Sequence, residues 1–168
     1  MSERFSSTAK GAGAFEPRPR PDVPKDVQVS FVLWLAAVAA GVFETVLAVM
    51  EELSPGGSIS GTGLVLGVGI RLIIFAAAVY VASQMRLGKN WARLTLAIGL
   101  GVIGILSLMI SPVSWLAEGH SVAKFLTDAG LMTLLFTTSR VVHVAAVLTA
   151  LVFMFLPAAN NYFRANVR

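Results

Sequence analysis

Apolar residues along this chain occur in four long runs separated by short polar segments. The runs cover about Val29–Met50, Thr62–Gln84, Trp91–Ser111 and Thr138–Leu156. Each is close to the ~20 residues that cross a ~30 Å hydrocarbon core as a helix. Lipid cannot satisfy exposed backbone donors and acceptors, so each run is predicted to be helical. The pattern predicts an all-α fold, a four-transmembrane-helix bundle over residues 29–157.

Residues that break helices follow each run and set the predicted ends of the spans. They are Ser54-Pro55-Gly56-Gly57, Gly88-Lys89-Asn90, Ser111-Pro112 and Pro157. The segment 122–136 also has apolar residues at roughly helical spacing. Two interpretations of it stay open: an interfacial helix on the outer leaflet, or an N-terminal extension of the fourth span.

The two ends of the chain are polar. Residues 1–28 carry Pro17, Pro19, Pro21 and Pro24 and have little apolar surface to bury. This composition predicts a disordered, proline-rich cytoplasmic tail. Residues 158–168 are predicted to form a short cytoplasmic C-terminus.

Composition supports a membrane location and excludes chemistry that depends on cysteine. Hydrophobic residues make up 56% of the chain and charged residues only 13%, whereas soluble domains carry about 25% charged residues. The chain has no cysteine, which excludes disulfides and thiolate metal sites. The net charge is +4, and the Lys and Arg residues flank the apolar runs instead of forming one stripe. This distribution favours contact with anionic lipid headgroups over contact with nucleic acid.

The distribution of Lys and Arg predicts the orientation. One side has Arg4, Lys10, Arg18, Arg20, Lys25, Arg86, Lys89, Arg93, Arg164 and Arg168, and the other has Lys124. By the positive-inside rule, a multi-pass plasma-membrane protein with both termini in the cytoplasm is expected. An aromatic belt is expected at the two interfaces, from Trp34, Trp91 and Tyr162 inside and Trp115 outside.

The second and fourth runs align without gaps, with Arg71 matching Arg140 and Ala76-Ala77 matching Ala145-Ala146. The alignment suggests a duplicated helical hairpin. Chance is the alternative, because apolar helices use few residue types.

Besides Arg93, which is counted above with the basic residues of one side, four ionisable residues lie inside the predicted spans: Glu44, Arg71, Arg140 and His143. A charge near a helix centre costs ~2.5–3.5 kcal/mol on the insertion scale, so it is normally paired or faces water. At ~1.5 Å per residue, Glu44, Arg71 and His143 share one level in the outer half of the bilayer. Arg140 lies nearer the outer boundary. Glu44 is therefore expected to approach Arg71 or the fourth span.

This polar cluster has three interpretations. The first is a structural Glu44–Arg71 ion pair, completed by His143 or backbone carbonyls. The second is a functional site for a proton, an ion or a small ligand, and the third is that Arg140 only extends to the outer headgroups. Two arginines against one glutamate suit an anionic lipid headgroup better than a metal. We find no motif for a metal, a cofactor or catalysis, and an enzyme is not expected.

Three short segments resemble small, uncharacterised four-helix membrane proteins of actinobacteria. They are Gly88-Lys89-Asn90-Trp91-Ala92-Arg93, the stretch from Leu156-Pro157 to Arg164, and Ser30-Phe31-Val32-Leu33-Trp34 after the proline-rich tail. The resemblance covers most of residues 17–168. It implies a plasma-membrane protein with cytoplasmic ends, and no activity or site residue is carried over with it.

Two functions agree with these observations. The first is a non-enzymatic accessory or scaffold component of a larger membrane complex, with a protein partner or a second copy. It is favoured by small size, short loops and small-residue helix faces. The alternative is a small transporter or a ligand- or lipid-binding protein with a polar intramembrane site at Glu44, Arg71 and His143.

Overall fold

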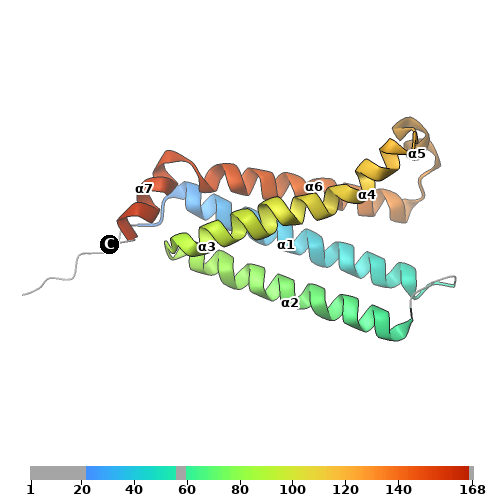
Figure 1. Ribbon diagram of the computed structural model, residues 1–168, viewed down its shortest axis with the longest axis horizontal. Coiled ribbons are helices and arrows are strands. Elements are labelled where there is room, and N and C mark those ends of the chain that lie inside the picture. Colours follow the sequence, from blue (N-terminus) through green and yellow to red (C-terminus); the bar gives the residue numbers. More distant parts are fainter. Residues whose placement is uncertain (1–21, 56–59, 167–168) are drawn as a thin grey trace, which may run out of the picture.

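The computed structural model describes residues 22–55 and 60–166, and every element within these ranges is a helix (Figure 1). The elements are α1 (Lys25–Glu52), α2 (Gly61–Arg86), α3 (Asn90–Thr95), the π-helix η1 (Leu96–Gly104), α4 (Ile105–Ala117), α5 (Val122–Asp128), α6 (Leu131–Met154) and α7 (Pro157–Asn166). The elements α3, η1 and α4 form one continuous span. Four helices, Lys25–Glu52, Gly61–Arg86, Asn90–Ala117 and Leu131–Met154, are long and apolar enough to cross a membrane, which confirms the predicted four-helix fold.

Different elements lie at the two ends of the bundle. The start of α1, the α2–α3 turn and α7 lie together at one end, which we call the terminal end (Figure 1). The end of α1, the start of α2 and the short helix α5 lie at the opposite end, which we call the loop end (Figure 1). The α2–α3 turn is tight because Gly88 adopts a φ of 83°, which side chains with a Cβ disfavour.

Helix α1 is the central helix of the bundle and packs along α6. Its buried residues recur every three or four positions: Val27, Ser30, Trp34, Ala37, Gly41, Glu44, Thr45 and Leu47. This spacing places them on one helix face. The Ser30 hydroxyl donates to the Ala150 carbonyl of α6 at 2.9 Å, and the Ser139 hydroxyl donates to the Ala40 carbonyl of α1 at 3.4 Å.

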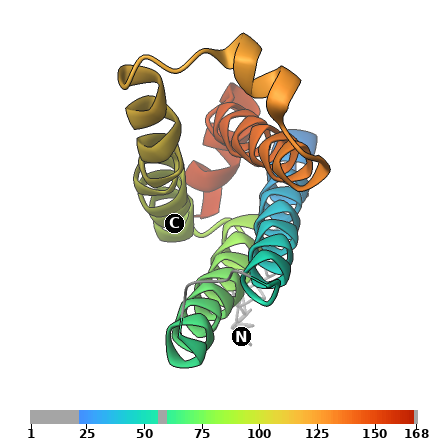
Figure 2. The same cartoon turned by 90° about the vertical axis from the view of Figure 1, so that its right-hand side faces the viewer.

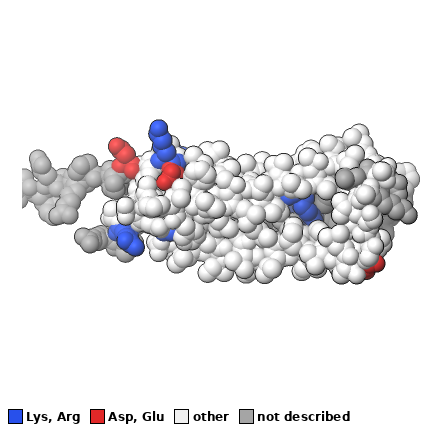
Figure 3. Space-filling view, turned by 90° about the horizontal axis from the view of Figure 1, so that it is seen from above, with Lys and Arg blue, Asp and Glu red and all other residues white. Residues whose placement is uncertain are grey.

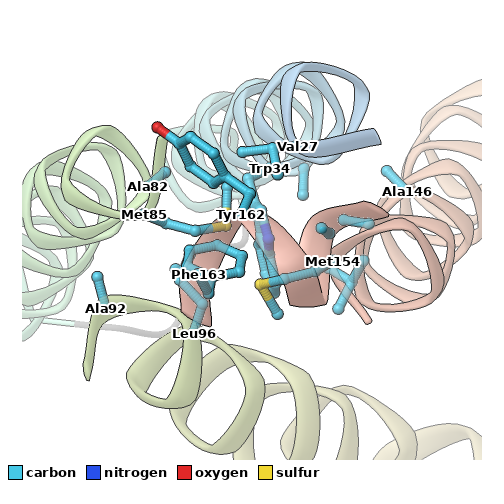
Figure 4. Packing of buried hydrophobic residues seen from close by; sticks show 14 residues of the cluster. Val27, Trp34, Ala82, Met85, Ala92, Leu96, Ala146, Met154, Tyr162 and Phe163 are labelled. Atoms are coloured by element: carbon cyan, nitrogen blue, oxygen red, sulfur yellow. The ribbon is translucent and has the colours of Figure 1, made fainter. Parts of the chain in front are cut away.

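The tightest packing lies at the terminal end, around α7. Trp34, Met85, Leu96, Met154 and Phe163 come from five different elements and are each less than 2% exposed. Figure 4 shows these side chains converging between the helices. The phenol of Tyr162 on α7 also donates to the Arg86 carbonyl of α2 at 3.0 Å. Helix α7 therefore closes this end of the bundle.

The loop end is more open, because α4 stands away from the other spans. None of the 13 residues of α4 is buried. Viewed along the bundle, α4 is separated from α1 and α2, and α5 bridges from it to α6 (Figure 2). The π-helix η1 precedes α4, and π-helical segments change the direction and register of a helix.

Several predicted boundaries were wrong. The third span does not stop at Ser111-Pro112 but continues to Ala117, with Pro112 inside α4; proline is tolerated in membrane helices when the freed carbonyl finds another partner. The predicted C-terminal tail contains α7, which begins with Pro157, a residue suited to the first helical turn. Residues 25–28 of the predicted tail belong to α1, and residues 1–21 lie outside the described part of the chain.

The segment 122–136 is divided between two helices. Helix α5 is separate and short, whereas α6 begins already at Leu131, seven residues before the predicted start of the fourth span. The expected aromatic belt was partly wrong, because Trp34 and Tyr162 are buried, whereas Trp91 is about half exposed.

Candidate functional site: a polar cavity between the spans

Glu44 is the centre of a three-residue polar cluster that joins α1 to α6. Its Oε2 atom lies 3.2 Å from Arg140 Nη2, and its Oε1 atom lies 3.3 Å from His143 Nδ1. The carboxylate accepts from both partners, so the His143 ring donates through Nδ1. The Glu44 side chain is 8% exposed, and those of Arg140 and His143 are 25% and 19% exposed. Each carboxylate oxygen thus has its own cationic or N–H partner.

The spacing of residues on α6 explains how one carboxylate meets both partners. Arg140 and His143 are three positions apart, so their side chains leave the same face of the helix. The guanidinium of Arg140 also lies 4.7 Å from the centroid of the Phe136 ring, one turn away on α6. Such cation–π contact restricts the guanidinium to one position beside the cluster.

The predicted partnership of Glu44 with Arg71 was wrong, and its predicted approach to the fourth span was confirmed. Among the described residues, ion pairs to Glu44 come from Arg140 and His143, and Arg71 forms none. The alternative that Arg140 only reaches the headgroups was also wrong, because Arg140 binds Glu44. Arg140, and not Arg71, pairs with Glu44 because α6, not α2, packs closely on the Glu44 face of α1.

Arg71 nevertheless belongs to the same site. A cavity of about 410 Å³ lies between the four spans, and its wall includes all four predicted site residues. Its loop half is polar, with Glu44, Arg71, Arg140, His143, Ser107 and Ser111. Toward the terminal end the wall becomes apolar, with Ala37, Val38, Phe75, Ala78, Leu100 and Val147, and it reaches Trp34. From Trp34 to Ala48 the cavity follows α1 over roughly 20 Å.

The wall of this cavity carries more hydrogen-bond donors than acceptors. Nε of Arg140 and Nε1 of Trp34 are both buried and have no hydrogen-bond partner within the described residues. Arg71 adds a whole guanidinium without a carboxylate. Buried donors are normally satisfied, so this wall is chemically suited to an acceptor-rich, anionic group.

The charge on the surface agrees with this arrangement. Figure 3 shows Lys and Arg gathered toward the terminal end, with basic atoms also visible in the loop half of an otherwise uncharged wall. Arg71 is exposed on α2, and Arg140 is a quarter exposed. With both arginines and Glu44 ionised, these three residues carry a net charge of +1.

Sequence reasoning identified the four ionisable residues and missed the apolar part of the site. Trp34 was placed at the membrane interface, and Phe75 was not singled out. The signal for Phe75 was its spacing, four residues after Arg71 on the same helix face. Gly41 also matters, because a Cβ there would lie 2.9 Å from Phe75 Cε1 and 3.4 Å from His143 Cε1.

Within residues 22–55 and 60–166, no group of three or more His, Asp or Glu side chains is placed to hold a metal ion. Comparisons of the chain with protein-family models, with curated proteins and with solved structures give no significant match.

Proposed function

We propose that this multi-pass membrane protein binds an anionic ligand in the cavity between its four spans, as a small binding protein or transporter. The observation that carries the proposal is the charge balance of the cavity wall. The wall contains two arginines, Arg71 and Arg140, and one carboxylate, that of Glu44. Arg140 and His143 already engage this carboxylate. The proposed role is binding, not catalysis.

The cost of placing charge in a membrane supports a functional reading of Arg71. An arginine at the centre of a span costs ~2.5–3.5 kcal/mol on the insertion scale. Glu44 offsets this cost for Arg140, whereas Arg71 has no carboxylate partner in the described part of the chain. A bound anion would supply the missing counter-charge. The cavity volume of about 410 Å³ also falls within the ~300–1,000 Å³ typical of ligand sites.

The test is binding of three probes to the full chain purified in a neutral detergent. The probes are inorganic phosphate, glycerol 3-phosphate and phosphatidylglycerol, and the readouts are isothermal titration calorimetry and native mass spectrometry. We expect at least one probe to bind, and Arg71→Gln to weaken it by about tenfold or more, because a hydrogen bond to a charged group is lost.

Arg164→Gln is the matched control, because it removes the same charge from an exposed position on α7. Its binding should equal that of the unmodified chain. If none of the three probes binds, or if both substitutions weaken binding equally, the cavity is not an anion site.

A second candidate is the accessory role, in which α2 packs against another membrane protein or a second copy. The supporting observation is the open face of α2: a Cβ added at Gly67 or Gly69 would meet no heavy atom within 4 Å. Glycines on a span allow close approach of another helix. Arg71 follows on the same helix and could pair with a carboxylate of that partner.

The absence of native cysteine makes this candidate directly testable. A single Gly67→Cys chain carries a maleimide-linked benzophenone, which on irradiation inserts into C–H bonds of any protein in contact with it, and is irradiated in native membranes. The accessory role predicts a crosslinked species from this position and none from Val142→Cys, an exposed position on α6. Recovery of only the unlinked chain from both variants would exclude a partner on α2.

A further inference from the structure

The structure contains a second, larger hollow that adjoins the polar cavity. It has a volume of about 690 Å³ and lies between α4 and α6, beneath α5. Its wall is almost entirely apolar and includes Met109, Leu116, Val141, Val144 and Leu148. We call it the α4–α6 groove. Val141, Leu116 and Leu148 are at least about half exposed, so the groove opens on the side of the bundle that faces lipid in a membrane.

The groove and the polar cavity share part of their walls. Ser111, Phe136 and Arg140 line both. Arg140 is therefore placed where the apolar groove meets the polar chamber, and its Nε atom has no partner among the described residues. A molecule lying in the groove would end at a guanidinium.

The loop end of the groove is closed by aromatic side chains. Trp115 of α4 contacts Phe125 of α5 edge to face, with ring centroids 5.6 Å apart. Both residues line the groove. The groove is thus covered toward the loop end and open sideways, between α4 and α6. Because α4 has no buried residue, this lateral opening is not closed by packing.

We propose that the ligand is an anionic lipid taken directly from the bilayer, with its headgroup at Arg140 and Arg71 and a hydrocarbon chain in the α4–α6 groove. This inference rests on the proposed anion-binding function and names its ligand class. Charge complementarity selects the headgroup, since the cavity wall contains two arginines and a single carboxylate, and Arg140 and His143 already engage that carboxylate. Continuity of the apolar wall with Arg140 selects an amphiphile over a free anion. Basic pockets between spans are known as a general solution for binding lipid headgroups.

Two neighbouring valines provide a matched pair of variants. Val141 and Val142 are both exposed on α6, and only Val141 lines the groove. Val141→Trp fills the groove and leaves Glu44, Arg140 and His143 unsubstituted. Val142→Trp adds the same bulk to the lipid-facing surface outside it. Equal thermal unfolding of the two variants would establish that both fold.

The experiment measures retention of dioleoyl phosphatidylglycerol, dioleoyl phosphatidylcholine and glycerol 3-phosphate by the full chain, using native mass spectrometry from neutral detergent. We expect phosphatidylglycerol to be retained at least about tenfold better than phosphatidylcholine, because charge-assisted hydrogen bonds distinguish their headgroups. Val141→Trp should lower phosphatidylglycerol retention about tenfold, and Val142→Trp should leave it unchanged.

The outcomes separate this inference from the proposed function. If glycerol 3-phosphate binds as well as the lipid, and Val141→Trp has no effect, the site binds anions and the lipid inference is overturned. If phosphatidylcholine is retained equally, the headgroup assignment is overturned. If neither anionic probe binds at all, both the proposed anion-binding function and the lipid inference are overturned.

Discussion

At the scale of single residues, Glu44 organises the site. Its carboxylate engages Arg140 and His143 and so couples α1 to α6 inside the bundle. The same contacts leave the second arginine, Arg71, without a carboxylate among the described residues. One acidic residue therefore has two consequences: it fixes helix packing, and it sets the positive balance of the cavity.

Replacing Glu44 by Gln should destabilise the fold. The amide carries no negative charge, so the Arg140 guanidinium loses its counter-charge and the charge-assisted hydrogen bond is weakened. We expect the free energy of unfolding to fall by about 1–3 kcal/mol, the cost of one unsatisfied buried group. Thermal unfolding in detergent measures this, with Glu51→Gln, an exposed position near the loop end, as control. Equal stability of both variants would contradict a structural role for the cluster.

Replacing Gly41 by Ala should also destabilise the protein, through packing. The new Cβ would lie 2.9 Å from the Phe75 ring, and overpacking of this kind costs about 1–3 kcal/mol. Phe75→Leu in the same chain should recover part of the loss, because the two positions are in contact. Gly69→Ala is the control: with open space around its Cβ, it should be neutral or stabilise the helix by up to about 1 kcal/mol.

At the scale of elements, α7 is the part of the fold that the hydropathy pattern did not reveal. It is held by Arg93, which is only 7% exposed. The guanidinium lies 4.1 Å from the Phe155 ring centroid and 4.9 Å from that of Phe163, and Nη2 donates to Oδ1 of Asn160. A planar, stacking cation between two aromatic rings is a role that lysine does not reproduce.

Arg93→Lys should therefore loosen α7 while the four spans stay folded. Loss of stacking and of the hydrogen bond to Asn160 corresponds to about 1–3 kcal/mol of local stability. Hydrogen–deuterium exchange should show faster exchange over residues 157–166 and little change in α1 or α6. Arg164→Lys, at an exposed position, should alter neither the exchange over residues 157–166 nor that in α1 and α6. Uniform acceleration across the whole chain would instead indicate global destabilisation.

At the scale of the whole molecule, the two ends of the bundle carry different charge. The terminal end, formed by the start of α1, the α2–α3 turn and α7, includes Lys25, Arg86, Lys89 and Arg164. Figure 3 shows basic atoms gathered toward this end. The positive-inside rule places such an end in the cytoplasm. The polar cavity would then lie in the outer half of the membrane, where the proposed anionic lipid would come from the outer leaflet.

Single cysteines test this orientation, because the chain has none of its own. A membrane-impermeant maleimide should label Ser121→Cys at the loop end in intact cells and leave Ala165→Cys on α7 unlabelled. Both positions are exposed, so permeabilised cells should show complete labelling of each. Labelling of Ala165→Cys alone in intact cells would invert the topology.

The sequence by itself determined the number and type of spans and the level of their charged residues. Hydropathy and length are local properties, and a helix rises by a fixed ~1.5 Å per residue. The relative level of Glu44 and His143 could thus be counted from the ends of their spans, and their contact confirms that they share one level. The duplicated hairpin and the resemblance to actinobacterial membrane proteins stay predictions.

Only the tertiary structure decided which cation pairs with Glu44, where the cavity lies and how α7 folds back. These features depend on which helix is the neighbour of α1 and on how far α4 stands from the bundle. Such contacts join residues about 100 positions apart, and composition of a single helix does not encode its neighbours. Arg71 and Arg140 are alike in sequence terms, and packing alone gave one of them the carboxylate and left the other facing the cavity.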